Sequence, residues 1–269
     1  MLKEPQMYVF DLDGVIYRGD MPLPHASETL RELRHRNRKI FFFTNNATKS
    51  REDYRSKLER MGISAPLDEI MTSAYATSLY FKESDKLGGR VYVVGEAGLV
   101  REMESAGMEV VRNGDSAHID FVVVGLDRQF TYDKLAKAQQ AILGGAEFVA
   151  TNTDSTFPIE DGVVIPGGGS IVSAVATASG VEPFVVGKPR TYALKKIIEI
   201  AESTPDRSVM VGDRLETDVL GGNRMGMPTV LITTGVSTRS DAENTSGDMR
   251  PSRVIDDLIE LLDESETMR

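Results

Sequence analysis

The chain has 269 residues, of which 41% are hydrophobic and 27% charged, and its formal net charge is −10 at pH 7. This composition is ordinary for a globular protein and excludes intrinsic disorder as a description of the whole chain. Acidic and basic residues are mixed along the sequence, which argues against a DNA- or RNA-binding protein because such a protein needs a basic face. An anionic substrate would have to be attracted by local positive groups and a metal.

The sequence has no cysteine, which excludes disulfides and thiolate chemistry. Its three histidines, His25, His35 and His118, lack the spacing of metal ligands and are expected at the surface or in turns. The N-terminal residues show no signal-peptide pattern, and no segment approaches the roughly 20 apolar residues of a membrane span. The sequence therefore predicts a cytoplasmic protein.

Short apolar runs alternate with helical patterns from the start of the chain. The run Met7–Phe10 is continuously apolar, as expected for a buried parallel strand. A helix is predicted at His25–Asn37 and a second strand at Lys39–Phe43. The next helix begins after Ser50, an N-cap residue, and ends at Gly62. This βαβα order predicts a parallel sheet covered by helices.

A middle section has strands and helices of its own. Strands are predicted at Arg90–Val94, Phe121–Val124 and Glu147–Ala150, and helices at Ala97–Ala106 and Tyr132–Leu143, each followed by glycine. The run Gly167–Ser170 precedes a helix predicted at Ile171–Ala178. It lacks the lysine of a P-loop, so we expect a tight turn at which backbone segments approach each other.

The alternation resumes at the end of the chain. The predicted elements are strands at Phe184–Val186, Ser208–Val211 and Thr229–Thr233, and helices at Tyr192–Ser203, Glu216–Met225 and Val254–Asp263. The polar stretch Ser237–Ser252 is expected to be a mobile loop. The fold class is therefore α/β, with a doubly wound parallel sheet formed by residues 1–82 and 185–269. Residues 83–184 are predicted to form an inserted α/β domain.

Polar clusters follow four of the predicted strands, where ligand sites gather in parallel sheets. Asp11 and Asp13 come directly after the first strand, and a divalent metal or a proton would relieve the repulsion between them. An acidic β-turn is the alternative. The other clusters are Thr44-Asn45-Asn46, Gly187-Lys188-Pro189 and the segment Gly212–Asp218. Each has an ordinary turn or helix cap as its alternative, but together they offer the groups of a phosphate site.

These motifs resemble the haloacid dehalogenase (HAD) superfamily, and within it the NagD and 4-nitrophenylphosphatase-like branch. The matching segments are DLDGVIYRG (11–19), TNN (44–46), GKP (187–189), GDRLETD (212–218), VVGEAGL (93–99) and ATNTDSTFPIEDGVVIPGGGS (150–170). The resemblance covers essentially the full length. It implies a HAD-like, Rossmann-like core with a large C2-type α/β cap inserted between the second and third motifs.

The resemblance also implies Mg²⁺-dependent hydrolysis of small phosphate monoesters. Asp11 would be the nucleophile that forms an aspartyl-phosphate, and Asp13 would act as general acid and base. The metal would be held by the Asp11 carboxylate, the backbone carbonyl of Asp13 and Asp213. Oxygen ligands of this kind suit magnesium.

Further roles follow from the same resemblance. Lys188 would balance negative charge, and Asp218 would orient Lys188 or a water on the metal. The predicted substrate and phosphate contacts are Thr44, Asn45, Lys188, Arg214, Asn152 and Asp154. For Asn152 and Asp154, a loop held together by side-chain hydrogen bonds is an equal alternative.

Three other functions remain open from the sequence. A phospho-acceptor signalling module uses similar residues, but such modules are shorter and have no inserted domain. A phosphotransferase or sugar-phosphate mutase on the same core would pass phosphate to an acceptor. A non-catalytic binding protein would not need the carboxylate and lysine set. The expected partner is a small phosphorylated metabolite, with no nucleic acid and no membrane, and a homo-oligomer is left open.

Overall fold

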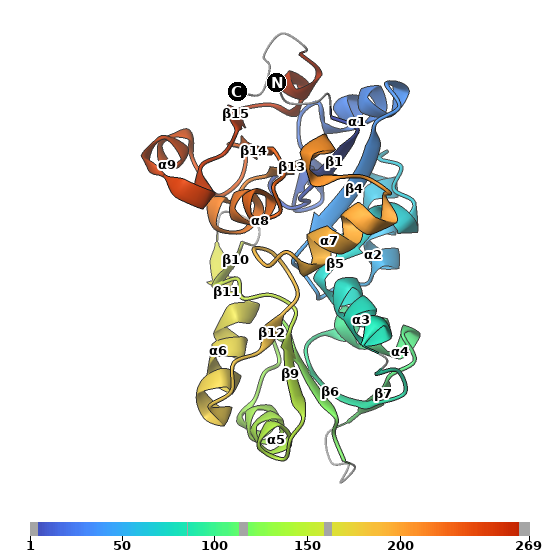
Figure 1. The fold of residues 1–269 in the computed structure, drawn as a ribbon, viewed down its shortest axis with the longest axis vertical. Helices are drawn as coiled ribbons and strands as arrows, with labels where there is room; N and C mark the ends of the chain where they lie inside the picture. Colours follow the sequence, from blue (N-terminus) through green and yellow to red (C-terminus); the bar gives the residue numbers. More distant parts are fainter. Residues whose placement is uncertain (1–4, 85, 113–117, 159–162, 264–269) are drawn as a thin grey trace. The chain divides into compact units, whose positions relative to one another are not determined.

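The computed structural model describes residues 5–84, 86–112, 118–158 and 163–263 (Figure 1). Contacts divide the chain into two compact units. Unit 1 comprises Met1–Thr44, Tyr54–Met71 and Lys188–Arg269, and unit 2 comprises Asn45–Asp53 and Thr72–Gly187. Among the described residues, every helix is too short or too polar to span a bilayer.

Unit 1 is built on a six-stranded sheet in the order β15-β14-β13-β1-β4-β5. Its strands are β1 (Met7–Phe10), β4 (Lys39–Thr44), β5 (Ile70–Thr72), β13 (Ser208–Gly212), β14 (Thr229–Ile232) and β15 (Arg253–Ile255). The pairs from β15 to β4 are parallel. The strand order doubles back beside β1, so the chain is wound in both directions from the centre, as the sequence predicted.

Helices cover both faces of this sheet. They are α1 (Ala26–His35), α2 (Arg51–Arg60), α7 (Tyr192–Ile200), α8 (Leu220–Arg224) and α9 (Arg239–Asn244). On one face, Phe10 packs in a cluster with Leu30 of α1 and Tyr54 of α2. On the other, Leu231 of β14 packs with Ala242 of α9. Burial on both sides explains why β1 and β4 are almost continuously apolar.

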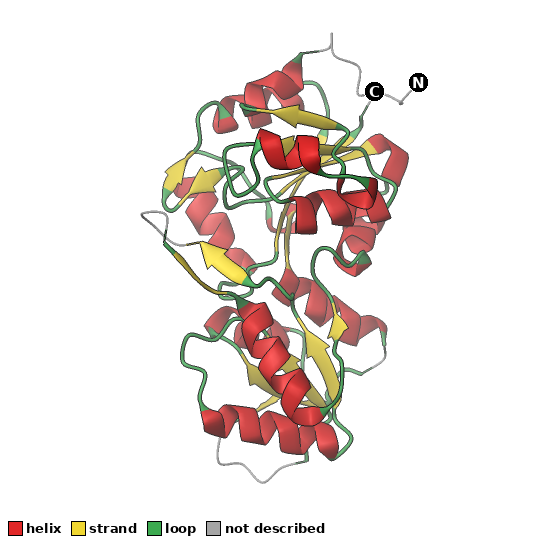
Figure 2. Ribbon diagram, turned by 90° about the vertical axis from the view of Figure 1, so that its left-hand side faces the viewer, coloured by secondary structure: helices red, strands yellow, loops and turns green. Residues whose placement is uncertain are grey.

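Unit 2 contains a second parallel sheet, in the order β12-β9-β8-β6-β7. Its strands are β6 (Arg90–Val94), β7 (Glu109–Val111), β8 (Phe121–Val124), β9 (Glu147–Ala150) and β12 (Phe184–Val185). Its helices are α3 (Ser73–Glu83), α4 (Ala97–Ser105), α5 (Tyr132–Leu143) and α6 (Gly168–Ser179). Figure 2 shows strands with helices beside them in each unit.

Two short hairpins complete the structure. In unit 1, β2 (Tyr17–Arg18) pairs with β3 (Met21–Pro22) in antiparallel fashion directly after the first acidic motif. In unit 2, β10 (Thr156–Pro158) pairs with β11 (Val164–Pro166). The predicted α/β fold with parallel sheets is confirmed.

The prediction for the end of the chain was wrong. Val254–Asp263 is not one helix, because β15 adds Arg253–Ile255 to the sheet beside β14 and a 3₁₀-helix follows at Leu258–Leu262. Asp257 caps this 3₁₀-helix through a reciprocal capping box with Glu260. The apolar residues of this segment have helical spacing, but its first residues form a strand because they pair with the free edge of β14. The segment's own sequence does not reveal this partner.

The stretch Ser237–Ser252 was also predicted wrongly as a loop. It contains α9, whose N-terminus has a capping box between Thr238 and Asp241. The predicted helix Glu216–Met225 begins instead with a π-helical turn, Leu215–Val219, which continues into α8. The polar composition of Ser237–Ser252 gave no sign of α9, which is stabilised by its N-terminal cap and by the buried Ala242.

Two further predictions can be compared with the structure. The histidines His25, His35 and His118 are exposed, as expected. The glycine run brings backbones together, because a Cβ at Gly167 would lie 2.3 Å from the carbonyl oxygen of Asp154. However, α6 begins at Gly168, three residues earlier than predicted.

The contact boundary between the units differs from the predicted domain boundaries. Contacts assign α3 and residues 45–53 to unit 2, and the return to unit 1 occurs at Lys188. The sequence placed these boundaries at residues 82/83 and 184/185. The boundaries 82/83 and 184/185 for a separately folding inserted domain stay a prediction.

Candidate active site

The first candidate site lies at the carboxyl ends of β1 and β13 in unit 1. These strands are parallel neighbours, with Phe10 in register with Val211. The backbone N–H of Asp11 donates to the carbonyl oxygen of Val211 at 2.9 Å. Asp11 and Asp213 follow these strands and therefore emerge at the same sheet edge.

Three carboxylates converge there. Asp11, Asp213 and Asp218 each present an oxygen within 4.8 Å of the others, and Asp213 and Asp218 are buried. Burial raises the pKa of Asp11 well above its usual range, with Lys188 opposing and Asp218 and Asp213 adding to the shift. Burial, reinforced by Asp218, raises the pKa of Asp213 to about 7. Such crowding is relieved by a bound cation, whose charge favours the ionised carboxylates.

Lys188 lies inside this cluster and is 2% exposed. Its Nζ is 2.8 Å from Asp11 Oδ1, 2.7 Å from Asp218 Oδ1 and 3.0 Å from the carbonyl oxygen of Phe43. Burial disfavours the charged form, but the carboxylates of Asp11 and Asp218 outweigh it and raise the lysine pKa. Its three N–H donors thus meet three acceptors on separate segments of unit 1.

Asp213 and Asp218, two of the three acidic residues of the last motif, differ in their partners. Asp218 Oδ1 forms an ion pair with Lys188 Nζ at 2.7 Å, and its Oδ2 accepts from the backbone N–H of Arg214 at 3.1 Å. Asp213 Oδ2 accepts from the backbone N–H of Val236 at 2.8 Å, and in the described part of the chain no salt bridge joins Asp213 to a lysine. Asp213 therefore offers a carboxylate that is not paired with a lysine, whereas Asp218 is paired with Lys188.

A glycine cradle surrounds the Asp213 carboxylate. A Cβ on Gly235 would lie 1.9 Å from Asp213 Oδ2, and a Cβ on Gly14 would lie 2.6 Å from it. Gly14 also has φ +82°, which favours glycine. Sequence analysis missed Gly235, because its position just after the predicted strand Thr229–Thr233 does not reveal its contact with Asp213.

Asp13, Thr44 and Arg214 also belong to unit 1. Asp13 is half-buried in the turn after β1, and the hydroxyl of Tyr17 donates to its Oδ2 at 3.4 Å. Thr44 is buried at the end of β4, one residue beyond the Phe43 carbonyl that receives Lys188. The charge of Arg214 lowers the pKa of Asp213, opposing the effect of burial.

Comparison with known proteins identifies the family. A family model described as haloacid dehalogenase-like hydrolase matches residues 8–109, and a second, HAD-hydrolase-like, matches residues 185–261. The chain is 37% identical over 265 residues to the acid sugar phosphatase of Staphylococcus saprophyticus, covering 98% of this chain and 100% of that protein. The chain belongs to the haloacid dehalogenase-like hydrolases. Its relatives establish that it is a phosphatase.

Solved structures of phosphatases support the same assignment. The p-nitrophenyl phosphatase from Archaeoglobus fulgidus is 33% identical, with a TM-score of 0.89 over 97% of this chain and 99% of that one. A glycerol phosphate phosphatase from Mycobacterium tuberculosis in complex with magnesium is 34% identical, with a TM-score of 0.87 over 96% and 76%. NagD from Escherichia coli is 29% identical, with a TM-score of 0.84 over 96% and 98%. The predicted NagD-like branch, with a Rossmann-like core and a cap, is confirmed.

Three predicted site residues of this HAD phosphatase lie in unit 2. Asn45 donates from Nδ2 to both carboxylate oxygens of Asp154, at 3.0 and 3.2 Å. Asn152 donates to the carbonyl oxygen of Asn45 at 2.7 Å. Side-chain hydrogen bonds therefore hold the loop that carries Asn152 and Asp154, which is the alternative to a substrate-binding role stated in the sequence analysis. A part for these residues in substrate binding stays a prediction.

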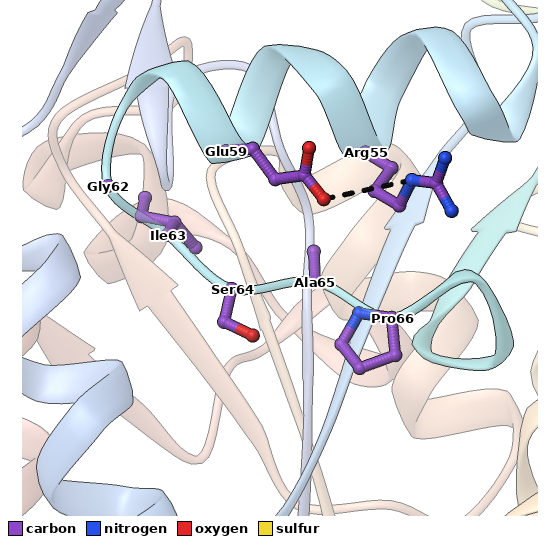
Figure 3. A pocket seen from close by; sticks show the side chains of 7 residues that line it. All are labelled: Arg55, Glu59, Gly62, Ile63, Ser64, Ala65 and Pro66. Atoms are coloured by element: carbon purple, nitrogen blue, oxygen red, sulfur yellow. Dashed lines mark ion pairs between the residues drawn. The ribbon is translucent and has the colours of Figure 1, made fainter.

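A surface hollow of the phosphatase is lined by none of the residues of the acidic cluster. It has a volume of about 450 Å³ and is lined by Arg55, Glu59 and residues 62–66 (Figure 3). Arg55 Nε and Glu59 Oε1 are 3.7 Å apart on one face of α2, and the two side chains are 41% and 59% exposed. An exposed pair of this kind contributes little binding energy, so the hollow lacks the convergent buried groups of a catalytic site.

Proposed function

We propose that this phosphatase hydrolyses small phosphate monoesters with the help of Mg²⁺ and through an aspartyl-phosphate on Asp11. The observation that carries the proposal is the cluster at the ends of β1 and β13. There the Asp11 carboxylate, which is 14% exposed, lies close to the buried carboxylates of Asp213 and Asp218 and to the buried ammonium group of Lys188. Three acidic groups with a single ammonium suit a divalent cation and an anionic substrate.

The residues present fit magnesium. Asp11 and Asp213 offer carboxylate oxygens within 4.8 Å of each other. We assign the metal to these two side chains and to the backbone carbonyl of Asp13. Bound there, Mg²⁺ would supply the positive charge that allows an anionic ester to approach an anionic carboxylate. The Mycobacterium tuberculosis neighbour in complex with magnesium supports this choice of metal.

The chain's own residues then divide the chemistry. The Asp11 carboxylate attacks phosphorus, and water later cleaves the acyl phosphate. Asp13 gives a proton to the leaving oxygen and afterwards removes one from the attacking water. Lys188 stays charged beside Asp11 and balances the negative charge of the phosphoryl group. Asp218 keeps the ammonium group of Lys188 in place.

Phosphate and substrate contacts form the remaining part of the proposal. Thr44 and Arg214 lie at strand ends of unit 1 and are assigned to phosphate oxygens, together with Asn45. Asn152 and Asp154 are assigned to the substrate body. The relatives carry names that refer to sugar, glycerol and nitrophenyl phosphates, which supports a small phosphorylated metabolite as substrate.

The test is phosphate release from a panel of phosphorylated metabolites, with and without Mg²⁺, by the wild type and by Asp11→Asn. We expect magnesium-dependent release by the wild type and a loss of roughly 10⁴-fold or more in the variant, because removal of a covalent nucleophile has effects of this order. Circular dichroism checks that Asp11→Asn remains folded.

Other outcomes would contradict the proposal in distinct ways. Near-normal turnover by Asp11→Asn would remove this residue from the nucleophile role. Phosphate that appears on an acceptor and not in solution would identify a phosphotransferase or mutase. A stable phosphoprotein without turnover would identify a signalling module.

A further inference from the structure

A buried hydroxyl contacts the carboxyl group of Asp13. Tyr17 has an exposed fraction of 0% and its Oη lies 3.4 Å from Asp13 Oδ2. Burial raises the pKa of the Tyr17 phenol well above its usual range, so the group is a hydrogen-bond donor at neutral pH. The distance is long for an O–H···O bond, as is common for catalytic groups before substrate binds. Because buried polar groups need partners, this contact also anchors the tyrosine.

The backbone fixes Tyr17 relative to Asp13. The N–H of Gly14 donates to the carbonyl oxygen of Tyr17 at 2.8 Å, and the N–H of Tyr17 donates to that of Leu12 at 3.2 Å. These bonds close a tight turn around Asp13 and lead into the β2–β3 hairpin. The hydroxyl is therefore held by the same turn that carries the carboxyl group.

A second element holds the tyrosine ring. Lys57 of α2 places its Nζ 3.7 Å from the ring centroid and is itself 7% exposed. A cation over an aromatic face at this distance is attractive, and more so where water is excluded. The same Nζ is 3.8 Å from Asp20, which follows the turn. The ring is thus held by the turn on one side and by α2 on the other.

We infer that Tyr17 is a positioning residue that holds the Asp13 carboxyl group in the orientation needed for proton transfer to the leaving group. This inference rests on the proposed function. Because Oδ2 receives the tyrosine hydrogen, we place the acidic proton of the proposed mechanism on Oδ1. In the first step, the bond from phosphorus to the leaving oxygen breaks and a bond to Asp11 forms. The Oδ1 proton moves to the leaving oxygen, and the Tyr17 hydroxyl stabilises the carboxylate that remains.

Two substrates separate this role from a purely structural one. An alkyl phosphate has a strongly basic leaving group and needs the proton of Asp13, whereas 4-nitrophenyl phosphate releases a weakly basic anion and needs it far less. The ratio kcat/KM reports steps up to formation of the phosphoenzyme, so later hydrolysis does not obscure the difference. The ratio between substrates is also independent of how much enzyme is folded.

The experiment measures kcat/KM of Tyr17→Phe with glycerol phosphate and with 4-nitrophenyl phosphate at saturating Mg²⁺. General acids contribute about 100- to 10,000-fold, so partial loss of orientation should lower the glycerol phosphate value about tenfold relative to the nitrophenyl value. Tyr8→Phe is the matched control, because Tyr8 is a buried tyrosine at the start of β1. It should leave the ratio unchanged.

Equal losses on both substrates, or no loss, would overturn the role of Tyr17. If Tyr17→Phe does not fold, Lys57→Met carries the test, with a smaller shift of the same ratio expected and an unchanged ratio refuting the inference. A wild type that releases phosphate from neither of these substrates nor any member of the metabolite panel would contradict the proposed function itself, so the two failures are distinguishable.

Discussion

The two parallel sheets of this phosphatase both present charged residues at the ends of their strands, but they use them differently. In unit 2, Asp127 follows β8 and pairs with Lys134 at 2.6 Å, and Glu96 follows β6 and pairs with Arg128 at 2.7 Å. In unit 1, Asp11 and Asp213 follow β1 and β13 and converge with Asp218 around one lysine.

The difference between the two sheets is visible in the pKa shifts of their carboxyl groups. Hydrogen bonds from Arg128 lower the pKa of Glu96, although partial burial opposes this. Burial instead raises the pKa of Asp213 to about 7, and Asp218 adds to the effect. A carboxylate with its own cation is satisfied, whereas crowded carboxylates need a further cation. The comparison teaches that parallel strand ends alone do not make an active site; convergence of unsatisfied charge does.

Among the three changes that test this comparison, Asp213→Asn should have the largest effect. This variant removes one charged ligand of the proposed metal, so the Mg²⁺ concentration for half-maximal phosphatase activity should rise by more than about 100-fold, since even outer hydrogen-bond partners of metal ligands are worth 10- to 100-fold. Glu96→Gln in unit 2 is the control and should leave the magnesium titration unchanged. An unchanged titration for Asp213→Asn would break the distinction between the two sheets.

A smaller effect is expected from Gly235→Ala. Its Cβ would be placed 1.9 Å from Asp213 Oδ2, so the carboxylate must move. Misplacement of about 1 Å at a site costs up to roughly 100-fold, and kcat/KM should fall by about 10- to 100-fold. Gly221→Ala is the control, because a Cβ there meets its nearest atom at 3.5 Å. Equal activities of the two variants would show that the site does not need a residue without a side chain at position 235.

The smallest effect concerns the ion pair in unit 2. Arg128→Met should lower the free energy of unfolding by about 0.5 kcal/mol at pH 7, because the pair is partly exposed. Arg128 depresses the pKa of Glu96 below 4.5, so its contribution is present above that value and is lost as pH falls through the folded-state pKa. Thermal unfolding at pH 7 and pH 3 measures this. A difference between wild type and variant that persists at pH 3 would contradict the ion-pair interpretation.

Most elements with a strong local signal were predictable. β1 lies at Met7–Phe10 and α5 at Tyr132–Leu143, as predicted, because a continuous apolar run and a capped amphipathic pattern are local properties. The end of the chain was not predictable in this way. Val254 and Ile255 are β-branched, which favours a strand, but they begin a segment whose apolar residues have helical spacing. Pairing with the exposed edge of β14 decided for the strand.

The candidate site shows the same division. Asp11, Asp13, Lys188 and Asp213 were identified from clusters at strand ends and from the family resemblance they form together. Gly235 and Tyr17 were missed, because their importance depends on what lies beside them: the Asp213 carboxylate in one case and the Asp13 carboxyl group in the other. Neither contact has a signature in sequence spacing.

The sequence by itself determined the α/β class, the positions of most of the longer strands and helices, and the chemical groups at the strand ends, because apolar periodicity and residue type act over a few neighbouring positions. Only the tertiary structure decided that Lys188 touches both Asp11 and Asp218, and that glycines enclose Asp213. These contacts join segments up to about two hundred residues apart, and pairing of distant strands sets them.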